Sequence, residues 1–425
     1  MSLLIKGGLV VDPSQGLEER RDLLVERGKI VALEPPGRIS DNGRRVISAQ
    51  GLVVAPGLVD MHVHLREPGE EYKETICTGT RAAVQGGFSA VAAMPNTKPV
   101  NDTAAVTRLI LDQAKEARNA RVYPVGAVSV GSKGEVLGEY GDLKAAGAVA
   151  LTDDGQPVTS ALLMRRALEY ARTFDLPVIS HCEDLDLRAD GVMHEGRVSL
   201  QLGLKGIPAA AEEVMVFRDL ALARLTGGRL HIAHVSTGGS VALIRLAKAQ
   251  GLAVTAETAP HYFSLTDAAV LGYNTHAKVN PPLRTDADVA AIKEGLRDGT
   301  LDAIACDHAP HSSLEKEVEF TAAAFGLIGL ETSLGLTLKL VHAGELSLMQ
   351  AIAALSPNPA RILGVEGGSL TPGGPADITL IDLNREWTVD VNTFASKSRN
   401  CPFNGWTLKG RAVMTIVGGK VVWEG

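Results

Sequence analysis

The chain has 425 residues, which is too long for one small core and fits one large domain with an accessory domain. Its composition, 45% hydrophobic and 21% charged, is that of a globular protein, and a net charge of −7 without a long basic cluster argues against a nucleic-acid surface. The four cysteines are scattered, the N-terminus has no signal-peptide pattern, and the most apolar segment, AAAFGLIGL, is too short to cross a bilayer. We therefore expect a cytoplasmic protein that binds neither nucleic acid nor membranes.

The two ends of the chain share a β-rich pattern that the middle lacks. Near the N-terminus, LLIKGGLVVD and LLVERGKIVAL are apolar runs interrupted by Gly-Gly and Arg-Gly-Lys, which predicts hairpin turns at both interruptions. Near the C-terminus, ADITLIDL and AVMTIVGGKVVW have the same character. We therefore predict a small composite β-sandwich domain formed by residues 1–55 and 367–425, around a separate central domain of residues 56–366.

The central region alternates between short β-branched runs and longer segments of helical period. Eight such runs occur in order: GLVDMHVH, FSAVAAMPN, ARVYPVGAVS, GAVALTDDG, LPVISHCE, RLHIAHVS, LAVTAETAP and LDAIACDHAP. This alternation predicts a parallel sheet with helices outside, and a closed (β/α)8 TIM-like barrel is the leading arrangement. A doubly wound open sheet is the alternative, but no Gly-rich phosphate turn follows the first strand.

The stretch VDMHVHLREPG places two histidines at the end of the first central strand. His62 and His64 are two residues apart, so they project from one face of the strand, with Cα atoms about 6.5 Å apart. Two imidazoles placed in this way can bind one metal ion. Two polar residues at a strand end are an equally good reading of the pattern taken alone.

Other strands end in residues of the same chemical kind. The fourth run ends in Asp153 and Asp154, the fifth in His181, the sixth carries His234 and the eighth ends in Asp307. The carboxyl ends of barrel strands meet at one rim, which is where barrel enzymes hold their chemistry. Because the donors outnumber the three protein ligands of a mononuclear catalytic zinc, they favour a pair of metal ions that share a carboxylate.

At this point the sequence resembles the dihydroorotases, of the long bacterial type within the amidohydrolase superfamily. The motifs that carry the resemblance, in order along nearly the whole chain, are HVHLREPG, MPN, TDDG, SHCED, HVST and CDHAPH. The resemblance implies a (β/α)8 barrel with a composite β domain, two Zn²⁺ ions, and the reversible cyclisation of N-carbamoyl-L-aspartate to L-dihydroorotate plus water in pyrimidine biosynthesis. It also implies a metal-bridging hydroxide, with Asp307 as the general acid and base.

The resemblance assigns metal ligands residue by residue. It implies that His62 and His64 bind one metal, that His181 and His234 bind the second, and that Asp154 bridges the two, while Asp307 is a ligand that also moves the proton. Many superfamily members bridge their metals with a carboxylated lysine, but this strand reads ALTDDG and has none.

A second set of residues is implied to bind the substrate. Arg66 lies two residues beyond His64, and its guanidinium can hold a carboxylate through two parallel hydrogen bonds. The alternative for Arg66 is a salt bridge to Glu67 or Glu70. Beside Arg66, the resemblance implies substrate contacts from His64, Asn96, Asn280, His311, Phe325 and Gly326.

Two other functions remain open from the sequence. A hydantoinase or allantoinase would hydrolyse a related cyclic amide, but it has no need of Arg66 because allantoin has no carboxylate. A non-catalytic dihydroorotase-like partner of aspartate carbamoyltransferase is the other alternative, and retention of every ligand position argues against it. A small-molecule substrate, a homodimer and an association with aspartate carbamoyltransferase are the partners that the resemblance allows.

Overall fold

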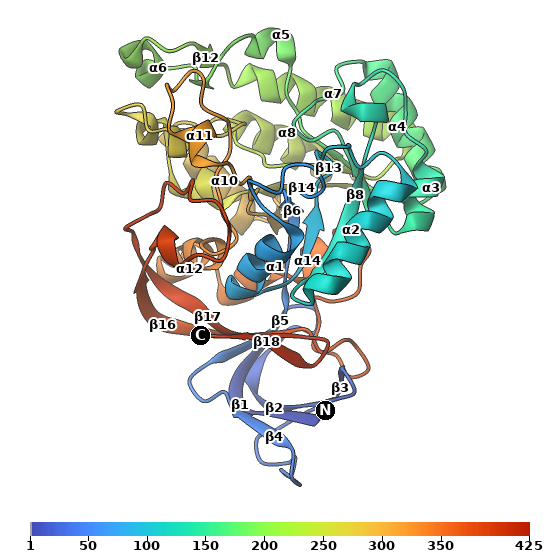
Figure 1. Cartoon of the computed structure of the whole chain (residues 1–425), viewed down its shortest axis with the longest axis vertical. Helices are drawn as coiled ribbons and strands as arrows, with labels where there is room; N and C mark the ends of the chain where they lie inside the picture. Colours follow the sequence, from blue (N-terminus) through green and yellow to red (C-terminus); the bar gives the residue numbers. More distant parts are fainter. Residues whose placement is uncertain (1) are drawn as a thin grey trace.

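The structure is a computed structural model that describes residues 2–425 (Figure 1). Both ends of the chain form one β domain, at the bottom of the view, as predicted. The strands follow the order β18-β17-β16-β5-β1-β2-β3, and β4 pairs with β1. Their bounds are β1 (Ser2–Asp12), β2 (Leu17–Glu26), β3 (Lys29–Glu34), β4 (Arg45–Ser48), β5 (Val53–Pro56), β16 (Ile378–Thr388), β17 (Thr407–Val417) and β18 (Lys420–Glu424).

The antiparallel pairing of β5 with β16 unites the two ends of the chain. Val54 lies opposite Leu380 in this ladder, and both side chains are buried in the apolar core of the domain. The prediction of a β domain composed from both termini is confirmed. The boundaries proposed for it, residues 1–55 and 367–425, stay a prediction.

The hairpin predicted at Gly7-Gly8 is wrong. Strand β1 continues through both glycines, and its register against β2 shifts between Ile5 and Gly8, as at a β-bulge. Gly7 adopts φ +74°, and a Cβ on Gly8 would lie 2.5 Å from Cγ2 of Val54, so the glycines serve a bulge and a close packing contact. The Arg27-Gly28 prediction is correct, because β2 turns into β3 at these residues.

The central region is a parallel barrel, as predicted. Its eight strands follow one another in the order β6 to β15, and a bridge between Val63 and His308 joins the last strand's end to the first. The His64 N–H donates to the His308 carbonyl at 2.9 Å across this closure. The strands are β6 (Leu58–Val63), β7 (Phe88–Ala93), β8 (Arg121–Ala127), β9 (Ala150–Thr152), β10 (Val178–Ser180), β13 (Leu230–Ile232), β14 (Val254–Thr258) and β15 (Ala303–Ile304).

Helices surround the barrel (Figure 1). Helix α2 shows why they form: Thr103 caps its first turn by accepting from the Val106 N–H, and Val106 and Ile110 bury one face. The main helices are α1 (Ile76–Gln85), α2 (Ala104–Ala117), α3 (Tyr140–Ala146), α4 (Ala161–Thr173), α7 (Ala210–Thr226), α8 (Gly238–Ala249), α10 (Asp286–Arg297), α12 (Ser333–His342), α13 (Leu348–Leu355) and α14 (Pro357–Leu363). None of the helices within residues 2–425 has the length and apolar character needed to cross a membrane.

Apolar packing fills the interior of the barrel. Apolar side chains of the strands, such as Met61 and Val125, fill the interior together with Ile362 and Leu363 of α14. Short elements lie in the connections beyond the carboxyl ends of the strands instead. They are α5 (Leu185–Arg188), β11 (Met193–His194), α6 (Arg197–Leu202), β12 (Gly206–Ile207), α9 (Pro260–Ser264) and α11 (Ser313–Lys316).

Candidate metal centre and substrate site

The structure brings the six predicted metal ligands together at the carboxyl ends of the barrel strands. All six are buried, and five of them, all except Asp307, form two groups that share Asp154. In the first group, Nε2 of His62 lies 3.1 Å from Oδ1 of Asp154, and Nε2 of His64 lies 3.5 Å from Oδ2. In the second group, Nδ1 of His181 and Nε2 of His234 lie 3.7 Å and 3.4 Å from Oδ1 of the same carboxylate.

Asp307 faces the first group. Its Oδ1 lies 3.2 Å from Nε2 of His64 and 3.6 Å from Nε2 of His62. Both Asp307 and His234 have positive φ values, 47° and 32°, which is an uncommon conformation for residues other than glycine. Such conformations persist where the surrounding structure fixes them, and they cluster at functional sites.

The donor set fits divalent metal ions. His62 donates from Nδ1 to the Glu257 carboxylate at 2.9 Å, and His64 donates from Nδ1 to the side-chain Oδ1 of Asn96 at 2.7 Å, so both rings turn Nε2 toward Asp154. Nε2 of His62 is buried and has no hydrogen-bond partner among residues 2–425, so a metal ion would satisfy it.

The two aspartates supply the negative charge that such a site needs. Burial raises the pKa of Asp154, but the neighbouring His62, His181 and His234 outweigh burial and hold that pKa well below its usual range. Burial also raises the pKa of Asp307, but His64 and His62 outweigh burial and lower this pKa to about 2. Both side chains are therefore carboxylates at neutral pH, which is the form that binds cations.

Two acidic residues position the ligands, a role that the sequence analysis assigned to neither of them. Glu257 holds Nδ1 of His62, and Asp153 accepts the backbone N–H of His181 at 2.9 Å. The alternation of side chains along LAVTAETAP could have placed Glu257 inside the barrel. Nothing local distinguishes Asp153 from Asp154, because each follows the same strand.

The predicted substrate residues Arg66 and His311 lie side by side. Nη2 of Arg66 is 3.4 Å from Nε2 of His311, and Nε of Arg66 donates to the Pro310 carbonyl at 3.2 Å. The alternative salt bridge is long, because Nη1 of Arg66 is 3.9 Å from Glu70, and Glu67 accepts from the Ile76 N–H instead. Most of the guanidinium's donors therefore remain available to a ligand.

Asn280 and Phe325 complete the surroundings of the ligand cluster. Asn280 donates to Glu183 at 3.2 Å, and its Oδ1 is buried without a partner among residues 2–425. The Phe325 carbonyl accepts from Nε2 of His311 at 2.8 Å. Burial lowers the pKa of His311 to about 2, and Arg66 acts in the same direction, so this imidazole is neutral. Gly326 has φ +131°, and a Cβ there would lie 2.7 Å from Ala309 Cβ.

A residue from the C-terminal part of the chain also reaches this site. Asn400, buried and far from the barrel strands in sequence, accepts the His311 N–H at 3.2 Å. Its amide donates to the carbonyls of Ala309 and Gly326 at 3.0 Å and 3.1 Å. Sequence reasoning missed Asn400, because no motif precedes it and only the fold brings it beside His311.

Three histidines without a predicted ligand role lie close to the site. His231 has Nε2 3.4 Å from Glu257, and His308 has Nε2 3.3 Å from Glu74, so both pair with carboxylates behind the cluster. His261 is buried, and neither ring nitrogen has a hydrogen-bond partner among residues 2–425. Burial lowers its pKa to about 4, so the ring is neutral.

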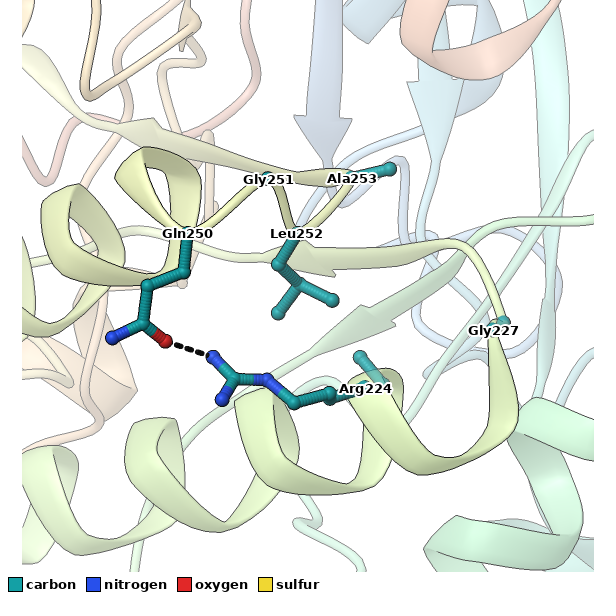
Figure 2. Close-up of a pocket in the computed structure, with 8 residues that line it drawn as sticks. Arg224, Gly227, Gln250, Gly251, Leu252 and Ala253 are labelled. Atoms are coloured by element: carbon teal, nitrogen blue, oxygen red, sulfur yellow. Dashed lines mark hydrogen bonds between the residues drawn. The ribbon is translucent and has the colours of Figure 1, made fainter.

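A groove of about 350 Å³ lies at the opposite end of the barrel, where α7 and α8 end. Figure 2 shows Arg224 paired with Gln250 across it, beside Gly227 and Gly251. None of the predicted ligands or substrate residues lines this groove. It is a separate surface feature from the cluster described above.

Two solved structures share the fold over nearly the whole chain. The L-hydantoinase (dihydropyrimidinase) of Arthrobacter aurescens matches with a TM-score of 0.89 at 26% identity, covering 99% of this chain and 96% of that one. The dihydropyrimidinase of Brevibacillus agri matches with a TM-score of 0.85 at 24% identity, covering 100% and 95%, and shows the same fold. A barrel of this type with a histidine and aspartate cluster at its strand ends defines a cyclic amidohydrolase.

Relatives that match this chain over its full length indicate which family of cyclic amidohydrolases it belongs to. The dihydroorotase of Geobacter sulfurreducens is 60% identical over 422 residues, covering 99% of each chain. That of Geobacter metallireducens is 58% identical over 424 residues, covering 100% of each. The sequence model of the Dihydro-orotase-like family matches residues 51–240. The chain belongs to the dihydroorotase family.

Proposed function

We propose that the chain catalyses the reversible cyclisation of N-carbamoyl-L-aspartate to L-dihydroorotate plus water, a step of pyrimidine biosynthesis. The observation that carries the proposal is the position of Arg66. This buried guanidinium lies beside His311, and its sequence neighbour His64 belongs to the histidine and aspartate cluster. A cyclic amide with a free carboxylate is the substrate that needs both features.

The metal ions are proposed to be two Zn²⁺ ions that share Asp154. His62 and His64 would hold one, and His181 and His234 would hold the other, with Asp307 as a further ligand. Bound zinc would act as a Lewis acid toward the amide carbonyl and would make water more acidic. Imidazole and carboxylate ligands also accept cobalt and manganese, so the identity of the metal rests on the family.

Arg66 would bind and orient the substrate carboxylate. A planar guanidinium donates two parallel hydrogen bonds to a carboxylate, and such charge-assisted bonds are roughly twice as strong as neutral ones. Asn96 and His311 would share this task, since Asn96 bonds to the ligand His64 and His311 lies beside Arg66. The carboxylate would thus be fixed at a set distance from the reacting amide.

Asp307 would move the proton. In the hydrolytic direction, water adds to the carbonyl carbon of the ring amide, and Asp307 takes its proton and gives it to the departing ring nitrogen as the C–N bond breaks. Closure is the reverse, and releases the same water. Asp307 suits this task because it is a carboxylate that faces the cluster and lies within 3.2 Å of His64.

The remaining contacts would fix the pyrimidine ring. The unpartnered Oδ1 of Asn280 can accept a ring N–H, since buried acceptors are normally satisfied. Backbone groups of Phe325 and Gly326 would contact the ring from the segment beside His311.

The alternative is a hydantoinase or allantoinase, and the fold neighbour from Arthrobacter aurescens is an L-hydantoinase. Arg66 separates the two, because hydantoin and allantoin carry no carboxylate. Zinc quantification together with hydrolysis assays on dihydroorotate, hydantoin and allantoin decides between them. Turnover of dihydroorotate alone supports the proposal, while turnover of hydantoin or allantoin at a higher rate contradicts it. A purified chain that binds no metal and gains no activity with zinc is the non-catalytic partner.

We also propose that the enzyme is cytoplasmic, because its four cysteines are free and scattered. A homodimer and an association with aspartate carbamoyltransferase stay predictions. Analytical ultracentrifugation of the chain alone, and of its mixture with aspartate carbamoyltransferase, tests both.

A further inference from the structure

Lys316 is a buried lysine that bonds to backbone carbonyls instead of a carboxylate. Its side chain is 1% exposed, and Nζ lies 2.7 Å from the Ala324 carbonyl, 2.9 Å from that of Gly326 and 3.4 Å from that of Lys278. No carboxylate within residues 2–425 forms a salt bridge with it. Burying an ammonium group without partners costs much free energy, and the hydrogen bonds to three carbonyls offset this cost.

We propose that Lys316 is a positioning residue for the substrate site. Its ammonium ties together the three segments that carry Asn280, His311 and Phe325. This inference rests on the proposed function, because those three residues are the proposed contacts to the carboxylate and the ring.

The first of these segments precedes Asn280. The Lys278 carbonyl accepts from Lys316 and also from the Gly326 N–H, at 2.9 Å. It therefore joins the segment that leads to Asn280 to the segment of Phe325. The Lys278 ammonium in turn donates to the carbonyls of Phe320 and Thr321, at 2.7 Å and 3.1 Å, and so fixes the other end of the same loop.

The second segment links Lys316 to His311 through the short helix α11. Ser312 and Glu315 form a capping box at its start, in which the Ser312 N–H donates to Glu315 at 3.0 Å. Lys316 is the last residue of α11, five positions after His311. The helix therefore sets the distance between the imidazole and the ammonium.

The third segment carries the Phe325 carbonyl. Lys316 bonds to the carbonyls on either side of it, those of Ala324 and Gly326, and the Phe325 carbonyl itself accepts from His311 at 2.8 Å. Without the ammonium, this peptide would keep only the bond from the Gly326 N–H to the Lys278 carbonyl and the bond from His311, so we expect it to become more mobile. His311 would then lose the partner that orients it beside Arg66.

A side chain that only fills space would not need to donate to three carbonyls at this position. Methionine has the length and volume to replace lysine but cannot donate to carbonyls, whereas arginine keeps the charge and several donors. The comparison of Lys316→Met with Lys316→Arg therefore separates positioning from packing. Lys248→Met is the control for loss of a lysine away from the site, because Lys248 pairs with Asp302 at 2.6 Å and donates to the Gly299 carbonyl at 3.2 Å, at the opposite end of the barrel.

Steady-state kinetics with dihydroorotate, zinc content and thermal melting should be measured on the full-length zinc enzyme. We expect Lys316→Met to raise KM by about tenfold or more, with kcat changed by less than about threefold and zinc content unchanged. Lys316→Arg should recover part of the loss, and Lys248→Met should keep the wild-type KM. An unchanged KM in Lys316→Met, or a fall in kcat that matches the loss of folded protein or zinc, would overturn the proposal.

Hydrogen–deuterium exchange supplies a readout that does not depend on the substrate. Lys316→Met should exchange faster than wild type in residues 278–280 and 320–328, and equal exchange would overturn the proposal. If Lys316→Met does not fold, Lys316→Leu, which also has no donor, takes its place with the same expectations. A wild-type enzyme that does not hydrolyse dihydroorotate would contradict the proposed function, and the exchange comparison would still decide the role of Lys316.

Discussion

Nδ1 of His62 lies 2.9 Å from Oε1 of Glu257, and both side chains are fully buried. The second oxygen of Glu257 lies 3.4 Å from His231. Burial raises the pKa of Glu257, but His231 and His62 together lower it to about 2, so it is a carboxylate in the folded enzyme. A carboxylate in this position fixes the imidazole's tautomer and orientation and makes it a better metal ligand.

We predict that Glu257→Gln lowers the affinity for zinc by about 10- to 100-fold, because the amide cannot hold His62 as a carboxylate does. Competition with a chromophoric chelator measures this affinity. Asp377→Asn is the control, since Asp377 is a buried carboxylate paired with Arg121 away from the cluster. Equal zinc affinities for Glu257→Gln and wild type would show that Glu257 does not support the metal site.

Replacement of Asp307 by alanine should abolish turnover but only weaken metal binding at the His62 and His64 group. The proton would have no carrier, and loss of a general acid and base lowers kcat by about 10² to 10⁴. Zinc per chain and kcat should be measured on the same preparation. Retention of kcat within about tenfold would assign the proton transfer to another group.

Arg66→Lys should raise KM for dihydroorotate by about tenfold or more, because an ammonium cannot replace the planar pair of donors. Glu70→Gln tests the alternative in which Arg66 serves as a salt-bridge partner. Since the Arg66–Glu70 separation is 3.9 Å, this variant should change KM less than Arg66→Lys. Equal effects of both variants would favour the salt-bridge role.

The stability of the protein should fall between pH 6.5 and pH 4 partly because of His194. Nδ1 of His194 accepts from buried Arg284 at 3.2 Å, and burial, together with this guanidinium, lowers its pKa from 6.5 to about 4. Between pH 6.5 and pH 4 the histidine is protonated in the unfolded chain but still neutral in the folded one. Lowering the pH through this range therefore reduces the free energy of unfolding by up to about 3 kcal/mol.

His194→Asn should remove this part of the acid sensitivity, because the asparagine carbonyl can accept from Arg284 without becoming charged. Urea denaturation at pH 7 and pH 4.5 measures the difference. His342→Asn, at an exposed histidine, is the control and should keep the wild-type difference. A His194→Asn variant as acid-sensitive as wild type would place the effect elsewhere.

The barrel and its ligand cluster could be predicted because each depends on a local pattern. Strand runs alternate with helical segments, and the carboxyl ends of parallel strands meet at one rim whatever the loops do. His62, Asp154 and His234 could therefore be placed together although they are far apart in sequence. The Gly7-Gly8 hairpin was wrong because two glycines signal a turn and a bulge equally well, and only the pairing with β2 decides.

The residues that support the site could not be predicted, because their partners are set by packing. The alternation along its strand could place Glu257 inside the barrel, but it does not identify His62 as the partner. Lys316 lies in a polar segment, where a lysine is normally exposed, yet it is buried against three carbonyls. Asn400 is separated from His311 by 89 positions, and no short-range pattern links them.

The position of Asn400 limits how far the C-terminal part of the chain can be truncated. It lies in the C-terminal part of the chain assigned to the β domain, yet its amide seats His311 and Gly326. A truncated chain that keeps only the barrel would lose Asn400 and its hydrogen bonds to His311 and Gly326 at the substrate site. A truncation intended to give a minimal enzyme should therefore keep the segment that contains Asn400 and precedes β17.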